Sequence, residues 1–406
     1  MMTKKAMLAT AAFLSLSTTP MLGQEVTISD SAVKTAILEN LGKAAGATIT
    51  ADDLAKVKIL QINSLSLSKI ALPDGLVNLE ELDISGNILS PSLFNPIRIP
   101  DDLASLKILN VGNNRLSNLN NFSHLTTVEV LKANGNGFGK ITIPDTFTNL
   151  KELDLRFNEL TTFVLQEGFV NLEVLNLANN ELNGSIFAGP VTFPSDLGNL
   201  RVLDLTFNDL GSLNVPAGLR SLELLYLEGN ELGSINFGGP LPQVKEIIAF
   251  NNKIRKLTLP EGMANLETLD LFGNQMTELT IQDGLTLEPF IDLAGNPIEK
   301  INVPEGTHQD LITYFIRFVD LEDIVFFPKA LPNLVDTKIL PTGEFEMVVS
   351  GPIGTYKVFE SLDLITWEEV GEVVNELGEV PFTRPIAASP FGAYRIEAVP
   401  EVVVEE

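Results

Sequence analysis

The sequence predicts a solenoid of short repeated coils with one parallel sheet, followed by a small all-β module. Three observations predict this fold. An asparagine recurs at a nearly constant spacing, leucines alternate with other residues ahead of each asparagine, and alternation without repeats follows residue 344. With 406 residues, the chain is long enough for more than one domain.

The composition is that of a folded, acidic protein. Hydrophobic residues make up 45% of the chain, and the net charge at pH 7 is −26. This charge disfavours nucleic acids and anionic membranes as partners, because both attract Lys and Arg. We interpret the acidity chiefly as surface solvation. The absence of cysteine excludes disulfides and thiolate-bound zinc.

Residues 1–23 have the pattern of a secretory signal peptide. Lys4 and Lys5 precede an apolar run at residues 6–16, and cleavage is expected near Gly23. No later apolar run reaches the ~18 residues that a transmembrane helix needs. We therefore expect bacterial export to the periplasm, the cell surface or the medium, without a transmembrane segment.

Residues 24–56 lack the recurring asparagine and predict a helical N-terminal cap. Asp30 is placed to cap a first helix, which Gly42 ends. Thr50 and Asp53 have the spacing of a capping box for a second helix. A cap is needed because the first coil of a solenoid otherwise exposes an apolar face.

Residues 57–306 repeat the pattern L-x-x-L-x-L-x-x-N-x-L, which is complete between Leu172 and Leu182. This is the signature of a leucine-rich repeat. Eleven coils are expected, with Leu65 at the asparagine position of the first. Eight of the ten spacings between these positions are 22 residues, and the others are 27 and 28. The asparagines expected to form a structural ladder are Asn87, Asn114, Asn136, Asn158, Asn180, Asn208, Asn230, Asn252, Asn274 and Asn296.

Each part of the repeat predicts a local structure. Alternating leucines predict a short strand with one buried face, and stacked coils align these strands into a parallel sheet on the concave side. The asparagine is expected to point inward and satisfy backbone groups. On the return side, apolar alternation followed by Pro and Gly, as at residues 257–262, predicts short extended or 3₁₀ pieces. Insertions at 90–96 and 183–190 are expected loops.

The repeats and the preceding segment together resemble bacterial exported leucine-rich repeat proteins with an internalin-like N-terminal cap. The resemblance implies a scaffold that binds a protein, or alternatively a glycan, on the concave face without catalysis.

After Gly306 the repeats stop. Thr307 and Asp310 begin a predicted helix, so residues 307–340 are expected to be a C-terminal cap followed by a linker at 321–340. Residues 341–400 predict a β-sandwich, and 401–406 an acidic tail. The run at 354–367 resembles C-terminal modules of exported proteins from Verrucomicrobia and Planctomycetes. We expect Trp367 in the sandwich core rather than in a sugar-stacking platform.

No arrangement of residues predicts catalysis. The two histidines, His124 and His308, lie in different parts of the chain, and neither is near a G-x-S-x-G or H-E-x-x-H motif. Carboxylates spaced one per coil lack the crowded oxygen cage that calcium requires. We therefore expect no enzyme activity, no cofactor and no metal. A glycan hydrolase, which needs two carboxylates, is the weakest alternative.

Residues between the strand leucines point from the concave face and supply the candidate binding site. Aromatic and apolar side chains on consecutive coils, with an acidic rim, have the composition of a protein-binding hot spot. The alternatives are that these side chains cover one another, or that the C-terminal region covers them. A different function, envelope attachment through the C-terminal module in a structural or adhesive protein, is the main rival. The candidate residues are Asp204, Tyr226, Glu228, Ile248, Phe250, Asp270 and Phe272.

Overall fold

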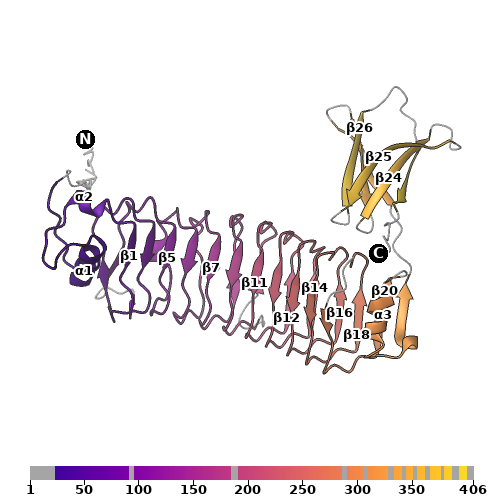
Figure 1. The fold of residues 1–406 in the computed structure, drawn as a ribbon, viewed down its shortest axis with the longest axis horizontal. Coiled ribbons are helices and arrows are strands. Elements are labelled where there is room, and N and C mark those ends of the chain that lie inside the picture. The colour runs from indigo at the N-terminus through magenta and orange to yellow at the C-terminus, as the bar shows by residue number, and fades with distance from the viewer. Residues whose placement is uncertain are drawn as a thin grey trace, which may run out of the picture.

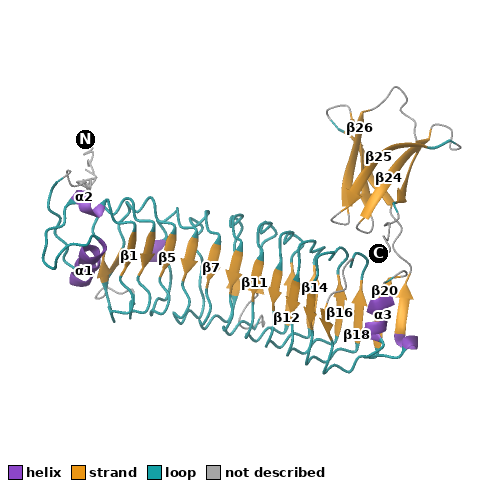
Figure 2. Ribbon diagram, viewed as in Figure 1, coloured by secondary structure: helices purple, strands orange, loops and turns teal. Residues whose placement is uncertain are grey.

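The described part of the chain is an elongated solenoid with antiparallel sheets near its C-terminal end (Figures 1 and 2). The predicted signal peptide lies outside the described residues except for Gly23, as do the acidic tail and most of both insertions. None of the described helices is long and apolar enough to cross a membrane. The computed structural model describes residues 23–90, 96–183, 191–285, 290–304, 307, 309–327, 333–340, 344–350, 354–361, 366–375, 379–385 and 393–399.

One strand from each coil joins a parallel sheet of eleven strands, which confirms the predicted solenoid. The middle residue of every strand in this sheet is buried, and the flanking residues are exposed or partly buried, apart from the buried Asp154, as the alternating pattern predicts. The strands are β1 (Ile59–Gln61), β3 (Glu81–Asp83), β5 (Ile108–Asn110), β6 (Val130–Lys132), β7 (Glu152–Asp154), β9 (Val174–Asn176), β11 (Val202–Asp204), β13 (Leu224–Tyr226), β15 (Glu246–Ile248), β17 (Thr268–Asp270) and β19 (Phe290–Asp292).

The return side consists of shorter parallel sheets and one 3₁₀ turn, η1 (Asn120–Phe122), which confirms the expected extended and 3₁₀ pieces. A coil of about 22 residues leaves too little chain for a full helix there. The return strands pair as β2 (Ile70–Ala71) with β4 (Ile97–Arg98), β8 (Phe163–Val164) with β10 (Val191–Thr192), β12 (Ser212–Val215) with β14 (Ser234–Phe237), and β16 (Lys256–Leu259), β18 (Glu278–Ile281), β20 (Lys300–Pro304) and β21 (Ile324–Phe327) in one sheet.

Two helices precede the first coil. The Asp30 carboxylate accepts hydrogen bonds from the first turn of α1 (Ser31–Asn40), and Thr50 and Asp53 form a capping box on α2 (Ala51–Leu54). Lys43 forms an ion pair with Asp53, which holds the pKa of that carboxyl well below its usual range. The buried side chains of both helices join the same apolar core as the repeat leucines. The core of the solenoid therefore continues into these helices.

The asparagine amides connect neighbouring coils. Asn180 Nδ2 donates to the carbonyls of Leu177 in its own coil (2.9 Å) and Leu155 in the preceding coil (3.0 Å). Its Oδ1 accepts from the N–H of Leu160 (3.1 Å). The equivalent asparagines make corresponding bonds, and all are buried except Asn296, which is partly exposed. In the first coil Leu65 is 51% exposed, and its N–H donates to Asn87 Oδ1.

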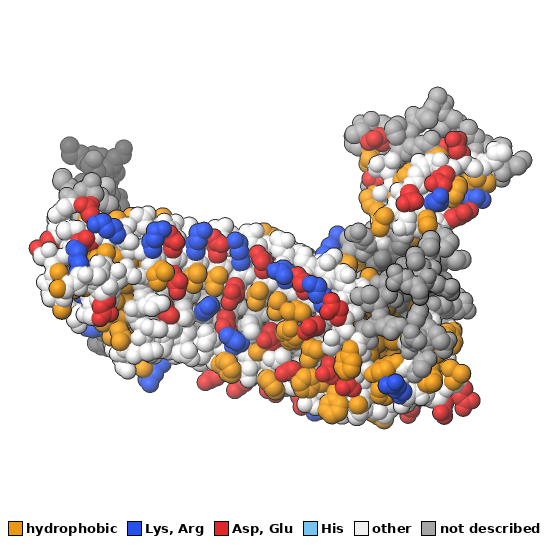
Figure 3. All heavy atoms as spheres, viewed as in Figure 1, with side chains coloured by type: hydrophobic (Ala, Val, Ile, Leu, Met, Phe, Trp, Pro, Cys, Tyr) orange, Lys and Arg blue, Asp and Glu red, His pale blue; other side chains and the backbone are white. Residues whose placement is uncertain are grey.

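A row of alternating charges lies where the chain enters the first ten strands of the eleven-stranded sheet. We call these ten residues the charge row. After the first member, each backbone N–H donates to the carbonyl of the member one coil earlier, over 2.7–2.9 Å. Figure 3 shows the row as alternating blue and red spheres along one edge. The members, in order, are Lys58, Glu80, Lys107, Glu129, Lys151, Glu173, Arg201, Glu223, Lys245 and Glu267.

Side chains of the charge row also form ion pairs across the coils. Lys58 lies 2.7 Å from Glu80, while Glu223 lies 2.6 Å from Arg201 and 2.9 Å from Lys245. Opposite charges on neighbouring strands attract, and like charges there are destabilising. The charge row therefore favours the observed order of the coils.

The segment expected to be a linker, 321–340, instead contains regular structure. After α3 (Gln309–Phe315), whose Leu311 and Phe315 are buried, the turn η2 (Leu321–Asp323) leads into β21. Strand β21 pairs in parallel with β20, and β22 (Asn333–Ile339) follows. The linker prediction was wrong because the edge of β20 offers unpaired backbone groups, which the next apolar segment satisfies.

The C-terminal region contains two antiparallel sheets of three strands each, ordered β22–β23–β26 and β25–β24–β27. Met347 and Val349 in one sheet, and Tyr356 and Val358 in the other, are buried on alternating positions. Trp367 is partly buried, and the Arg395 guanidinium lies 4.7 Å from its ring centre. The further strands are β23 (Glu344–Ser350), β24 (Gly354–Ser361), β25 (Glu368–Asn375), β26 (Glu379–Pro385) and β27 (Ala393–Ala398).

Candidate binding surface on the repeat sheet

The outward side of the eleven-stranded sheet, which we call the sheet face, carries all seven predicted site residues. The strand register aligns Asp204 with Tyr226, Tyr226 with Ile248, and Ile248 with Asp270. Parallel strands lie about 4.8 Å apart, so this row spans about 14 Å. Glu228 comes two positions after the row in its own coil, as do Phe250 and Phe272 in theirs. These expected residues lie close together because every coil repeats the same geometry.

Their exposure differs from residue to residue. Phe272 is 46% exposed, whereas Tyr226, Ile248 and Phe250 are partly buried. The three predicted carboxylates are also partly buried. In Figure 3, orange and red side chains gather over the C-terminal half of the sheet face. This half is therefore both more apolar and more acidic than its surroundings.

The structure adds three residues that the sequence analysis did not include. Phe207, in the coil of Asp204, is 53% exposed, and Phe290, in the coil after that of Phe272, is 61% exposed. Glu246, at the start of β15, accepts a hydrogen bond from the Tyr226 hydroxyl (3.2 Å). We define the acidic aromatic patch as Asp204, Phe207, Tyr226, Glu228, Glu246, Ile248, Phe250, Asp270, Phe272 and Phe290.

Phe207 occupies an unusual backbone position. It immediately precedes the ladder residue Asn208, with φ of 51°, in the left-handed region. In most other coils this position is glycine or asparagine, as at Gly229 and Asn251. The left-handed conformation costs a residue with a bulky side chain about 1 kcal/mol. Neither backbone preference nor burial favours phenylalanine at this position, which makes Phe207 a candidate for a role in binding.

Phe157 is the matching case in the N-terminal half of the solenoid. It has φ of 54° and is 58% exposed, but it lies beside Arg156, outside the acidic aromatic patch. The sequence signal for both residues was a phenylalanine directly before the ladder asparagine.

Within the described part of the chain, no Lys or Arg forms an ion pair with a carboxylate of the acidic aromatic patch, although the charge of Asp204 contributes to the raised pKa of the Arg156 guanidinium. Asp204 accepts from the Thr206 N–H (3.0 Å), and Asp270 accepts from the Phe272 N–H (3.0 Å). Burial, together with the charges of Asp204 and Asp270, raises the pKa of Glu228. The patch therefore carries negative charge that no ion pair of the described residues neutralises.

The N-terminal half of the same face is different. There Asp154 holds the guanidinium of Arg156 through two hydrogen bonds, of 2.9 and 3.1 Å. Among the carboxylates at this strand position, Asp154 is thus neutralised by an ion pair, whereas Asp83, Asp204 and Asp270 form none within the described residues.

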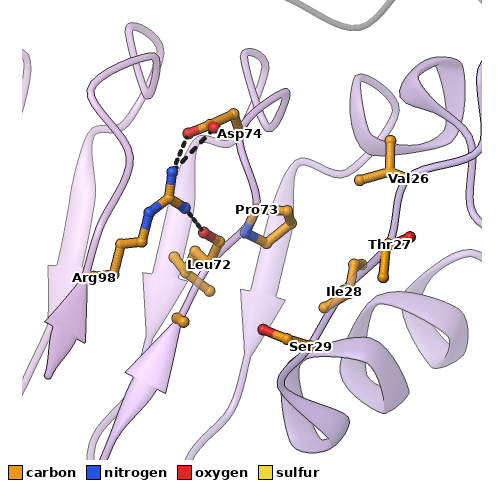
Figure 4. A pocket seen from close by; sticks show the side chains of 9 residues that line it. Val26, Thr27, Ile28, Ser29, Leu72, Pro73, Asp74 and Arg98 are labelled. Atoms are coloured by element: carbon orange, nitrogen blue, oxygen red, sulfur yellow. Dashed lines mark hydrogen bonds and ion pairs between the residues drawn. The ribbon is translucent and has the colours of Figure 1, made fainter. Parts of the chain in front are cut away.

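A shallow cavity of about 340 Å³ lies between the N-terminal segment and the first return strands (Figure 4). Its one guanidinium, from Arg98, donates to both oxygens of Asp74 (2.8 and 3.0 Å) and to the carbonyl of Leu72. This ion pair leaves neither group free to act on a ligand. The cavity is lined by Val26, Thr27, Ile28, Ser29, Ala71, Leu72, Pro73, Asp74 and Arg98.

The groups considered for catalysis or metal binding do not assemble in the described residues. His124 Nε2 lies 3.2 Å from the carbonyl of Pro100, on the coil surface. His308 lies outside the described residues. Within those residues, no three His, Asp or Glu side chains are grouped to hold a metal ion.

Comparisons with known proteins agree with the repeat geometry. Leucine Rich Repeat family models match residues 171–192, 148–162 and 199–213. No curated protein sequence matches the chain.

Similar solved structures include YopM, a leucine-rich effector protein from Yersinia pestis, at 23% identity and a TM-score of 0.46, covering 68% of this chain and 74% of that chain. InlP from Listeria monocytogenes is 17% identical, with a TM-score of 0.40, and the match covers 79% of this chain and 91% of InlP. An internalin, inlF, from the same organism is 18% identical, with a TM-score of 0.35 and coverage of 64% and 91%. The matched segments and the coils that share their pattern form a leucine-rich repeat solenoid of eleven coils.

Proposed function

We propose that this protein is a non-catalytic, exported recognition scaffold that binds a protein partner on the sheet face through the acidic aromatic patch. The observation that carries the proposal is the exposure of Phe207, Phe272 and Phe290 within one half of that face. Exposed aromatic rings that gather on a protein surface are typical of interaction sites, and aromatic residues dominate binding energy in them.

The shape of the surface favours a macromolecular partner. The acidic aromatic patch spreads over five coils, from β11 to β19, on a regular sheet. Small-molecule sites are usually concave and enclose most of the ligand. A protein segment matches an open surface of this length better than a small substrate does.

The remaining parts of the chain support this role. We infer that residues 1–23 direct export, since Lys4 and Lys5 precede an apolar run. Helices α1, α2 and α3 act as caps, because their buried side chains extend the apolar core at both ends of the solenoid. The two antiparallel sheets after residue 332 form a β-sandwich module.

The test is capture of native partners by residues 24–406, with and without the double substitution Phe250→Ala and Phe272→Ala. We expect partner binding to weaken by roughly tenfold or more, because hot-spot aromatics each contribute about 2 kcal/mol. Phe157→Ala is the matched control, since it removes an exposed phenylalanine elsewhere on the sheet face. Capture that is equal for wild type and double variant, with both folded, contradicts the proposal.

A further inference from the structure

We propose that the acidic aromatic patch recognises an extended polypeptide segment with two cationic side chains that flank an apolar one, in the order cation-x-apolar-x-cation. This inference rests on the proposed function and specifies the chemistry of the partner.

Charge complementarity identifies the partner as cationic. Asp204, Glu228 and Asp270 lie near one another, and within the described residues no Lys or Arg forms an ion pair with them; the charge of Arg156 acts on Asp204 only without direct pairing. Other sheet-side carboxylates, such as Asp154 and Glu223, have cations of the same chain against them. Burying unpaired like charges against an apolar partner is costly, whereas a guanidinium or ammonium group neutralises them.

Two coils of the patch, three strand intervals apart, each combine a carboxylate with an exposed ring. Asp204 lies three residues before Phe207 in one coil, and Asp270 lies two residues before Phe272 in the other. An arginine stacks on an aromatic face while its N–H groups donate to a neighbouring carboxylate. The Phe272 N–H occupies only Oδ1 of Asp270, so its second oxygen remains available as an acceptor. At Asp204, Thr206 donates to Oδ1 and the Asn176 amide donates to Oδ2 (3.0 Å), so this carboxylate attracts an arginine chiefly through its charge.

The middle of the patch contains most of its apolar side chains, beside Glu228 and Glu246. Tyr226, Ile248 and Phe250 lie between the two carboxylate–ring pairs and are partly buried. No carboxylate of the central coil other than Glu246 belongs to the patch, and Glu246 already accepts from the Tyr226 hydroxyl. An apolar side chain of the partner fits this central position.

The strand spacing determines the spacing of the partner's residues. Asp204 and Asp270 are three strand intervals apart, which is about 14 Å. An extended chain advances about 3.3 Å per residue, so four residues span about 13 Å. A segment that crosses the strands therefore places residues i and i+4 over the two ends and residue i+2 over the middle, all on the same side of the segment.

The experiment uses residues 24–406 and a fluorescent peptide of seven residues, with arginine at its second and sixth positions, leucine at its fourth and glycine elsewhere. Fluorescence anisotropy measures its affinity against two control peptides. One replaces both arginines with glutamate, and the other moves the arginines to the third and fifth positions. We expect the first peptide to bind at least several-fold more tightly than either control, and its affinity to fall as salt is raised, because salt screens exposed charges.

Two sets of variants locate the site. Glu228→Gln with Asp270→Asn removes charge with little change in shape, and we expect a loss of affinity of roughly tenfold. Asp83→Asn is the matched control, because Asp83 lies on the sheet face far from the patch and accepts the same type of turn hydrogen bond, from Ser85. Circular dichroism verifies that each variant is folded.

The outcomes separate this inference from the proposed function. If native partners depend on Phe250 and Phe272 but not on the carboxylates or on salt, and the three peptides bind alike, the cationic motif is wrong and the binding surface stands. If neither the peptide nor any native partner depends on the patch, both proposals fail. Binding that is lost equally in Asp83→Asn also overturns the inference.

Discussion

The ring of Phe207 lies over Gly229, the residue at the same turn position one coil later. A β-carbon at position 229 would lie 2.7 Å from Cδ1 of Phe207, closer than such atoms approach in folded proteins. Both residues have positive φ, 51° for Phe207 and 64° for Gly229. Glycine thus satisfies its own turn and also leaves room for the neighbouring ring.

This relationship predicts the effect of Gly229→Ala. The added methyl group must displace the Phe207 ring and also holds alanine at positive φ, so we expect a loss of about 1–2 kcal/mol of stability and weaker partner binding. Urea unfolding and partner affinity measure the two effects. Gly211→Ala is the control, since no atom lies within 4 Å of a β-carbon there and its φ is not positive. An unchanged affinity in Gly229→Ala contradicts the placement of the ring.

Replacing Phe207, whose backbone is strained, with asparagine tests the contribution of its ring to stability separately from its contribution to partner binding. Phe207→Asn relieves the left-handed strain, so we expect the protein to gain about 1 kcal/mol while its partner affinity falls. Phe157→Asn is expected to give a similar gain in stability without the loss of affinity. Thermal unfolding and binding measurements on both variants test this contrast. A destabilised Phe207→Asn protein shows instead that the ring supports the fold.

The asparagine ladder predicts that removing a buried asparagine amide lowers the stability of the protein more than removing an exposed one. Asn180→Ala leaves the N–H of Leu160 without a partner and removes one of the two asparagine hydrogen bonds that the carbonyls of Leu155 and Leu177 each accept, which costs on the order of 1–3 kcal/mol. Asn171→Ala in the same coil is the control, because its amide donates to Thr148 at the exposed surface. Equal shifts of the urea midpoint in the two variants rule out a special role for the ladder.

The coil architecture was predictable from the sequence because one asparagine position phases every coil. Once Asn208 and Asn230 are aligned, strand register and the inward direction of each leucine are determined. Two features were not predicted, although their signals were present. Phe207 was hidden because only its backbone conformation shows that phenylalanine is unfavourable there. The charge row was not recognised because its members are far apart in the sequence and become neighbours only when the coils stack.

The parts of the structure that the sequence predicted less well depend on contacts between segments that are not adjacent in the chain. The segment from 321 to 340 contains prolines and lacks the repeat pattern, which is typical of a linker. Strand β21 nevertheless forms there because β20 presents an open edge beside it. Exposure within the binding surface also depends on neighbours, since Phe250 is partly buried whereas Phe290 is 61% exposed.

The charge row predicts a specific response to acid. Hydrogen bonds from Arg201 and Lys245 lower the pKa of Glu223 to about 2, from an ordinary value of 4.5. Because the folded pKa is the lower one, the stabilisation by Glu223 is fully present above about pH 4.5 and is lost as the pH falls toward 2. We expect Glu223→Gln to lower the urea midpoint at pH 7, and this difference to shrink at pH 3.

Glu267→Gln is the control for that experiment. Glu267 ends the charge row and forms no ion pair within the described residues. A Glu223→Gln protein whose deficit is the same at both pH values shows that the ion pairs do not cause the effect.

The raised pKa of Glu228 predicts a pH dependence of stability opposite to that of Glu223. Burial and the nearby Asp204 and Asp270 charges raise its pKa, so ionising Glu228 destabilises the fold as the pH rises through that pKa. We expect Glu228→Gln to be more stable than wild type at pH 7 and nearly equal to it at pH 4. Glu181→Gln, at an exposed glutamate, is the control for a general charge effect. A stability gain that persists at pH 4 contradicts this origin.

The alternation of the charge row means that the solenoid can lengthen or shorten only by even numbers of coils without electrostatic conflict. Removing residues 223–244 would place Arg201 beside Lys245, whereas removing residues 223–266 would place Arg201 beside Glu267 and restore attraction. The 22-residue coil is the unit of packing, but the electrostatic period is 44 residues. In a chain of near-identical coils this doubled period distinguishes each coil from its immediate neighbours, so a slip of one coil during folding meets repulsion along the whole edge.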